Sequence, residues 1–259
     1  FTLARLLGVD LGWTPGTETA ISNSVNSTPY LTLGTDTLKS VLTTNLTAAL
    51  GTGALTADAG KLTFVSGQVE VDSGKGWQKA QLGTIVKEAD KIKTGAKGTV
   101  IISLKSGASL KLKSDSQITL SAVGNATSID VGTGSVFSKV DRRQAGQTFQ
   151  IRAQTMVAAV RGTEFYFAYG DKKKGKPKAD LWLCVNEGKV NVVDSSTSSN
   201  VDVNAGEGII IPTDKEIPKP KAYTWTKKLN WNMDSSKGDV EDKTNLKGAY
   251  KDLLKNNYD

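Results

Sequence analysis

Short segments of strand-forming residues, separated by tight-turn sequences, follow one another through the middle of this 259-residue chain. The turns include 72–76 (DSGKG), 105–107 (KSG) and 186–188 (NEG), which are rich in residues that reverse the chain. The predicted strands are residues 62–65, 68–71, 98–104, 109–112, 117–120, 134–140, 148–152, 156–160, 164–169, 179–186, 189–193 and 208–212. No helical segment lies between them, so the crossover helices of a parallel α/β sheet are missing. The pattern predicts an all-β fold for residues 61–215, an antiparallel β-sandwich or β-roll or a short β-solenoid.

The two ends of the chain differ from this middle part. Residues 1–60 are rich in threonine and poor in charge. Within them, residues 30–33 alternate as a strand does, whereas residues 38–50 fit an amphipathic helix equally well. We therefore treat residues 1–60 as an arm or as extra strands.

Residues 216–259 begin with a linker that Pro218 and Pro220 stiffen. An amphipathic C-terminal helix is predicted at 242–257, because apolar residues recur there at helical spacing. These residues are Leu246, Ala249, Tyr250, Leu253 and Leu254. We expect the helix to pack on its own domain; the alternative is a helix presented to a partner subunit.

The composition argues against most catalytic and metal chemistry. The chain has no histidine, the commonest general base and metal ligand, and its single cysteine, Cys184, lies in an apolar run where a buried, inert thiol is expected. Asp141, Glu164 and Glu187 are isolated from other carboxylates, and neither an EF-hand loop nor a phosphate-binding loop is present. We therefore expect no catalytic residue, no metal, no cofactor and no enzymatic activity.

The formal net charge is +7, and the basic excess belongs to residues 61–259. Because the lysines are scattered over predicted strand ends and turns, we interpret them as a solvated surface rather than a nucleic-acid site. One basic turn is denser, with Lys172, Lys173, Lys174, Lys176 and Lys178. A solvated turn is the simpler interpretation of it, and contact with an anionic surface polymer is the functional alternative. No apolar run is long enough to span a bilayer.

The stretch MVAAVRGTEFYFAY, residues 156–169, combines an apolar segment, a polar insert and an aromatic segment. Gly162 can adopt backbone angles that other residues avoid, so the insert is predicted to be a bend between two core strands. Thr163 is expected to bond nearby backbone, and Arg161 and Glu164 are expected to pair with each other or with neighbouring strands. The residues expected in the core beside the bend are Val157, Val160, Phe165 and Phe167. A ligand-binding role for the insert stays open.

Residues from about 64 to 213 resemble the FecR domain. The similarity is distributed: a turn-rich first part with Gly83, Asp90 and Thr94-Gly95, then GSVFSKVDRRQAGQTFQIRAQTMVAAVRGTEFYFAY, and finally LWLCVNEGKVNVV and VNAGEGIII. The family motif residues, expected to have a structural role, are Thr155, Val160, Arg161, Gly162, Thr163, Glu164 and Phe165. The resemblance implies an all-β domain of FecR type.

FecR proteins act in cell-surface signalling, where they sense an outer-membrane transporter and regulate a sigma factor. Since the sigma-binding region, transmembrane helix and signalling module of the full-length type are not recognisable here, the resemblance implies a stand-alone protein exported to the periplasm or cell surface. We expect it to be a non-enzymatic binding or scaffold protein that acts through protein–protein or protein–polymer contacts.

Two alternatives are kept open. The chain could be the subunit of an extracellular or periplasmic filament or sheath, with residues 1–60 making the subunit contacts. It could also be a periplasmic signalling regulator of the FecR type. The expected partners are proteins, further copies of the same chain or an anionic surface polymer, and not nucleic acid.

Overall fold

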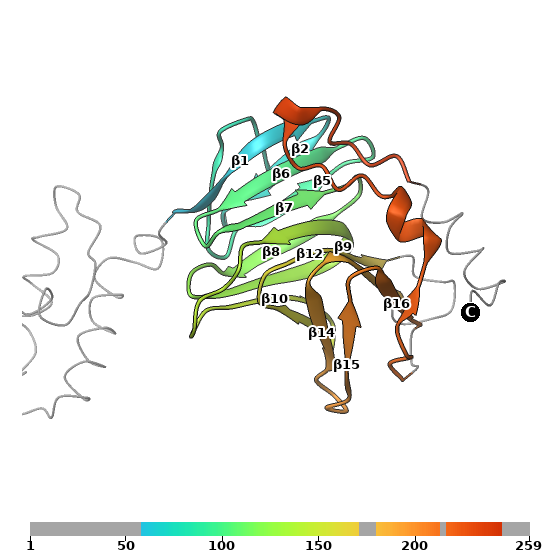
Figure 1. Cartoon of the computed structure of the whole chain (residues 1–259). Coiled ribbons are helices and arrows are strands. Elements are labelled where there is room, and N and C mark those ends of the chain that lie inside the picture. The colour runs from blue at the N-terminus through green and yellow to red at the C-terminus, as the bar shows by residue number, and fades with distance from the viewer. Residues whose placement is uncertain (1–57, 171–179, 213–215, 245–259) are drawn as a thin grey trace, which may run out of the picture. The chain divides into compact units, whose positions relative to one another are not determined.

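The computed structural model describes residues 58–170, 180–212 and 216–244, which contain 17 strands and only two short 3-10 turns (Figure 1). The all-β prediction is therefore confirmed for this part of the chain, and every strand expected from the sequence is present. The strands are β1 (Asp58–Ser66), β2 (Val69–Asp72), β3 (Gln78–Lys79), β4 (Ile85–Lys87), β5 (Lys91–Thr94), β6 (Thr99–Leu104), β7 (Ala108–Leu112), β8 (Gln117–Ala122), β9 (Ala126–Val140), β10 (Thr148–Ala153), β11 (Met156–Val160), β12 (Thr163–Gly170), β13 (Asp180–Glu187), β14 (Lys189–Asp194), β15 (Asn200–Asn204), β16 (Glu207–Ile211) and β17 (Lys221–Ala222).

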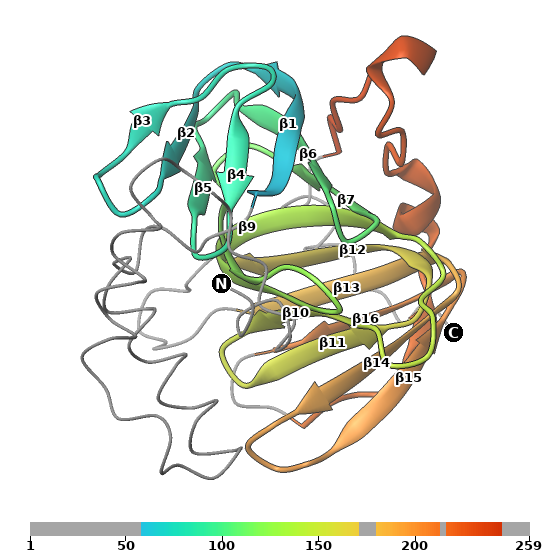
Figure 2. The ribbon, with the colours of Figure 1, turned by 90° about the vertical axis from the view of Figure 1, so that its left-hand side faces the viewer.

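The strands form two layers that share one strand. The first layer has the order β4-β1-β6-β7-β9-β12-β13-β16-β17. The second has the order β3-β2-β5-β8-β9-β10-β11-β14-β15, and Figure 2 shows β11, β14 and β15 side by side in it. All pairings are antiparallel except that of β9 with β10, which is parallel. The network is thus mixed, and its assignment to the roll, sandwich or solenoid type stays a prediction.

Strand β9 belongs to both layers because the chain changes layer in its middle. Its first half pairs with β8 and β10, and its second half pairs with β7 and β12. The change occurs at Gly134, whose φ of +85° lies in the region that favours glycine. A Cβ placed on Gly134 would lie 2.4 Å from the Cα of Ser116, so only glycine lets the strands approach this closely.

A single apolar core fills the space between the layers. It includes residues such as Leu62 and Phe167 from the first layer and Ile92 and Ile151 from the second. Cys184 is fully buried, as predicted, and burial raises the pKa of its thiol. Val157 is only half buried, whereas its neighbour Ala158 is fully buried, because alternate residues of a strand face opposite sides.

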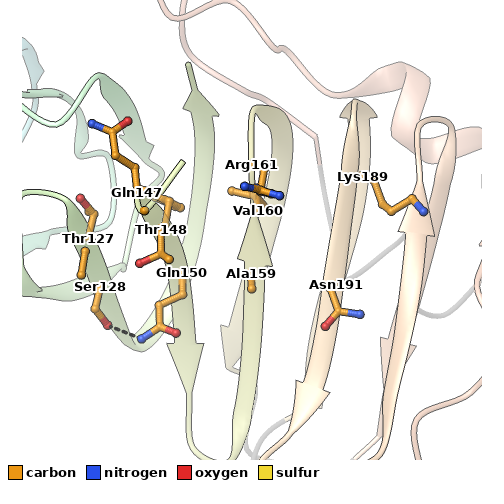
Figure 3. A pocket seen from close by; sticks show the side chains of 13 residues that line it. Thr127, Ser128, Gln147, Thr148, Gln150, Ala159, Val160, Arg161, Lys189 and Asn191 are labelled. Atoms are coloured by element: carbon orange, nitrogen blue, oxygen red, sulfur yellow. Dashed lines mark hydrogen bonds between the residues drawn. The ribbon is translucent and has the colours of Figure 1, made fainter. Parts of the chain in front are cut away.

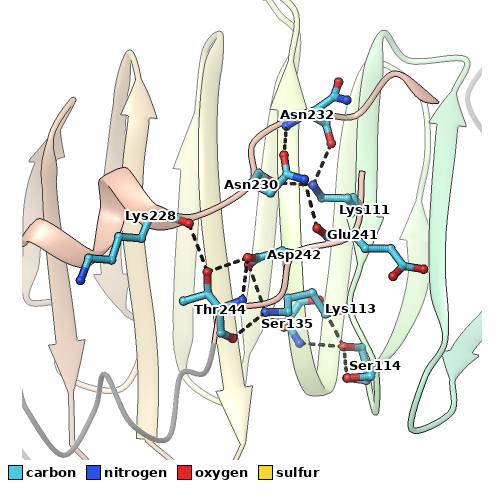
Figure 4. A network of polar contacts seen from close by, with 11 residues as sticks. Lys111, Lys113, Ser114, Ser135, Lys228, Asn230, Asn232, Glu241, Asp242 and Thr244 are labelled. Atoms are coloured by element: carbon cyan, nitrogen blue, oxygen red, sulfur yellow. Dashed lines mark hydrogen bonds and ion pairs between the residues drawn. The ribbon is translucent and has the colours of Figure 1, made fainter. Parts of the chain in front are cut away.

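The outer face of the first layer is covered by residues 223–244, which we call the strap (Figure 4). It contains the two 3-10 turns, η2 (Thr224–Lys228) and η3 (Ser235–Lys237). Trp231 and Leu229 pack on Phe137 and Tyr166 of that face. Apart from its first three residues, which are not helical, the predicted helix 242–257 lies outside the described residues, as do residues 1–57.

Lys111 of β7 and Lys113, the residue directly after this strand, hold the strap. Lys111 Nζ donates to the main-chain oxygens of Asn230, at 2.6 Å, and Asn232, at 2.8 Å, and lies 4.3 Å from the centre of the Phe137 ring. Lys113 Nζ lies 3.0 Å from Asp242 Oδ2 in an ion pair that is almost completely buried. The expectation of a fully solvated lysine surface is therefore wrong at Lys111, because the strap covers a face that strand alternation alone would leave exposed.

Candidate functional site

The two outer faces of the molecule differ in what covers them. On the first layer, one row of neighbouring residues, Lys111, Phe137, Tyr166 and Cys184, is completely buried, and the strap packs on this row. On the second layer, β10 and β14 carry half-buried and exposed polar side chains, and the outward residues of β11 between them, Val157 and Ala159, are half buried. The second face is thus the one that described residues leave open to a ligand.

An open depression of about 600 Å³ lies on this second face (Figure 3). Its wall and floor come from β9, β10, β11 and β14 and from the turn before β10. The residues that matter most for its chemistry are Thr148, Gln150, Ala159, Arg161, Lys189 and Asn191.

Strand register explains how this depression forms. Gln150 of β10 and Asn191 of β14 are both paired with Ala159 of β11, so the small side chain lies between two longer ones. Their outward direction follows from the burial of alternate residues, such as Phe149 beside Gln150. Ala159 therefore forms the floor, and the two amide side chains stand on either side of it.

The amide side chains are held from their far sides. Gln150 Nε2 donates to Ser128 Oγ at 3.2 Å, and Asn191 Nδ2 donates to Asp202 Oδ1 at 2.8 Å. Each amide keeps a second N–H and an acceptor oxygen that form no hydrogen bond with the described residues, and these groups remain for a ligand.

The charged residues that line the depression are both cations. Lys189 Nζ lies 3.0 Å from Asp202 Oδ2, and both side chains are about half exposed. The hydrogen bond from Asn191 and the contact with Lys189 lower the pKa of Asp202. Arg161 is exposed and makes no side-chain hydrogen bond or ion pair with the described part of the chain.

A second arginine lies behind Arg161. The main-chain N–H of Arg143 donates to the Arg161 carbonyl oxygen at 3.2 Å. The Arg143 side chain is 8% exposed, packs over Phe149 and donates through Nη1 to the Ser106 carbonyl oxygen. Its Nε and Nη2 have no hydrogen-bond partner among the described residues, and burial lowers its pKa against the attraction of Asp141.

The motif insert lies where the chain leaves β11 in the second layer and enters β12 in the first. Val160 and Phe165 are buried on either side of it. Gly162 has a φ of +126°, and a Cβ on it would lie 2.8 Å from the Arg142 Cα. Thr163 Oγ1 donates to the Lys189 carbonyl oxygen at 3.0 Å.

The two charged residues of the insert have separate surroundings. Glu164 is buried, accepts a hydrogen bond from Asn186 Nδ2 at 2.5 Å and lies 3.8 Å from Lys139 Nζ. Arg161 instead borders the depression, so the two side chains do not form a pair with each other. Thr155 lies in the β10–β11 turn, where its carbonyl oxygen accepts bonds from Ser195. The basic turn with Lys172, Lys173, Lys174, Lys176 and Lys178 lies outside the described residues.

The described residues contain no group of three or more His, Cys, Asp or Glu side chains that could hold a metal ion. They also contain no helix that is long and apolar enough to cross a membrane. The site that the geometry provides is therefore an open depression with a largely apolar lining, two hydrogen-bonding amides and one arginine without an ion pair among the described residues, which suits binding.

Sequence reasoning did not identify Gln150, Ala159 or Asn191. Alternation in TFQIRA, MVAAV and KVNVV places each of them on a strand face opposite the core. The missing information was the strand order, because β11 pairs with β14 across an excursion of the chain through the other layer.

Comparison with known proteins gives one family match. Residues 90–191 match the family described as FecR protein, which confirms the resemblance over that segment. Two crystal structures of a candidate anti-sigma factor from Parabacteroides distasonis are similar, each with 20% sequence identity and TM-scores of 0.44 and 0.43. The similarity covers 51% of this chain and 59% of each of those chains, so it spans about three-fifths of their length. No curated protein matches the sequence.

Proposed function

We propose that this protein is a signalling regulator of the FecR type, which acts by binding another protein and catalyses no reaction. The observation that carries the proposal is the match of residues 90–191 to the FecR family, because this segment runs from the start of β5 into β14. It therefore contains every residue that lines the depression on the second layer.

The geometry supports binding as the mode of action. The depression is open, it has two cationic residues in a largely apolar lining, and the described residues around it lack a paired nucleophile and base. A regulator that works through protein contact needs such a surface and no reactive group. We also propose that it acts outside the cytoplasm, in the periplasm or at the cell surface, as FecR proteins do.

The broader expectation of a scaffold or binding protein in the cell envelope is compatible with the same surface. The regulator is favoured because the family match points to signalling, whereas no described feature points to a filament. The two differ in a measurable way, since a regulator changes the expression of specific genes and a scaffold changes the envelope mechanically.

Deletion of the gene in its source bacterium, followed by RNA sequencing, tests the proposal. We expect a limited set of transcripts to change by at least several-fold and to return to normal when the full chain is supplied again. Unchanged transcripts under conditions in which the protein is produced would contradict a regulatory role. Long polymers of the purified protein in electron micrographs would favour the filament alternative instead.

A further inference from the structure

The depression on the second layer has the shape of a site for one extended segment. Along the row Gln150–Ala159–Asn191, the two amides are separated by two strand spacings, about 10 Å. Ala159 leaves the space between them empty at the level where both neighbours project (Figure 3). A narrow, elongated ligand fits this gap.

The charge of the lining selects the sign of that ligand. Lys189 is partly neutralised by Asp202, whereas Arg161 has no acidic partner among the described residues. The described lining residues include no carboxylate. An anionic group that enters from the Arg161 end therefore gains an ion pair without displacing an existing one.

Arg143 adds to the positive potential at this end. Its main-chain N–H is bonded to the Arg161 carbonyl oxygen, its guanidinium is buried over the Phe149 ring, and among the described residues only Asp141 offsets its charge. A buried cation that lacks hydrogen bonds at two nitrogens is energetically unfavourable, and an anion nearby would reduce that penalty.

We propose that the depression binds an extended acidic segment of a partner protein, with a carboxylate on Arg161 and the peptide groups on the amides of Gln150 and Asn191. This inference rests on the proposed function, because it names the part of the partner that is recognised. A polypeptide is favoured over a glycan for a second reason: the one aromatic residue in the described lining, Phe149, is buried, so no exposed ring is available to stack on a sugar.

The test uses the purified full chain and a fluorescently labelled hexaglutamate peptide, with binding measured by anisotropy. Three matched variants are compared with the wild type: Arg161→Gln removes the free cation, Ala159→Tyr fills the gap, and Lys79→Gln removes a cation from an exposed strand elsewhere. Arg161→Gln should weaken binding about fivefold or more, and Ala159→Tyr about tenfold or more, whereas Lys79→Gln should leave it unchanged. Circular dichroism checks that the variants are folded.

Four outcomes would overturn the proposal. They are the absence of hexaglutamate binding, equal binding of hexaglutamine, binding that neither depression variant weakens, and binding of a galacturonate hexamer that is as tight as that of hexaglutamate. The result is independent of the gene-deletion experiment. A regulator without hexaglutamate binding would keep the proposed function and lose this site, and the reverse result would keep an acidic-peptide site and lose the regulatory role.

Discussion

Lys111 is a lysine held inside the protein without a direct ion pair to any described residue. Its Nζ is bonded to two main-chain oxygens of the strap and faces the Phe137 ring. Burial lowers the pKa of Lys111 to about 8, although the charge of Asp242 acts in the opposite direction. The side chain therefore fastens the strap and carries a desolvation penalty while it is protonated.

The pH dependence of stability should reveal this penalty. Between pH 7 and pH 10 the unfolded chain retains the proton on Lys111 and the folded chain loses it, because the folded pKa is about 8 and the ordinary value is 10.5. Stability must therefore rise with pH in this window, by roughly 2 kcal/mol from this residue. Urea unfolding of the wild type and of Lys111→Met at both pH values measures the difference. If the wild type gains no stability relative to Lys111→Met between pH 7 and pH 10, Lys111 does not carry a buried charge in the folded protein at pH 7.

At Asp242, in contrast to Lys111, favourable interactions outweigh the effect of burial on the pKa. Burial alone raises the pKa of its carboxyl, but hydrogen bonds from Thr244 and the charge of Lys113 outweigh burial and leave the pKa lowered. We expect Asp242→Asn to destabilise the protein by about 3 kcal/mol near neutral pH, because Lys113 is left buried and unpaired. The difference in stability between the wild type and Asp242→Asn should have its full size above about pH 4. It should shrink as the pH falls through the lowered pKa of Asp242. Chemical unfolding of both proteins measures it.

The matched control is Asp239→Asn. Asp239 is also paired with a lysine, Lys243, but that pair is exposed. Its removal should change stability little. Equal losses in the two variants would mean that burial of the Lys113–Asp242 pair is not what makes it important.

At the scale of elements, the change of layer within β9 depends on a single glycine. Gly134→Ala should destabilise the protein by about 3 kcal/mol, since it adds both an unfavourable φ and a clash with Ser116. Gly132→Ala is the matched control, because a Cβ on Gly132 would have no atom nearer than 3.7 Å. Midpoints of urea unfolding compare the two. Similar midpoints for both variants would show that β9 can change layer without a glycine at position 134.

The existence of strands could be predicted from the sequence, whereas their pairing could not. Segments such as β6 and β12 carry long apolar runs between clear turn residues, so their type was unambiguous. Strands β3 and β17 have two residues each, and β5 has one fully apolar residue, so no periodic signal marks them. The depression could not be predicted from the sequence either, because it depends on which strands become neighbours. Lys111 was misread because its burial depends on the strap, more than a hundred residues away in the chain.

At the scale of the whole molecule, the two outer faces differ in whether a segment of the chain covers them. One is closed by a segment of the same chain, and the described residues leave the other open. The strap keeps Cys184 away from solvent even though the thiol lies on an outer face. The single cysteine can therefore report on whether the strap stays in place.

Trp231 provides the test. Its ring packs edge-on against Phe137 at 5.3 Å between ring centres, so Trp231→Ala removes much of the apolar contact of the strap. We expect Cys184 to react with a disulfide reagent about tenfold faster or more in the variant, because local opening of the strap becomes easier. Trp77→Ala, which alters a tryptophan stacked on Lys93 in another part of the fold, should leave the rate unchanged. Equal rates in all three proteins would show that the strap does not control access to the thiol.

The shared strand β9 also affects how the nascent chain can assemble. Among the described residues, every strand before β9 lies on one side of it in both layers, and every strand after it lies on the other side. As the chain leaves the ribosome, the edge of β8 therefore stays unpaired until residue 133 has emerged, and the edge of β7 until residue 140. Such edges can pair with other chains. The described strands before β9 should thus depend more on chaperones during synthesis than the strands after it, which emerge when β9 is already available as a template.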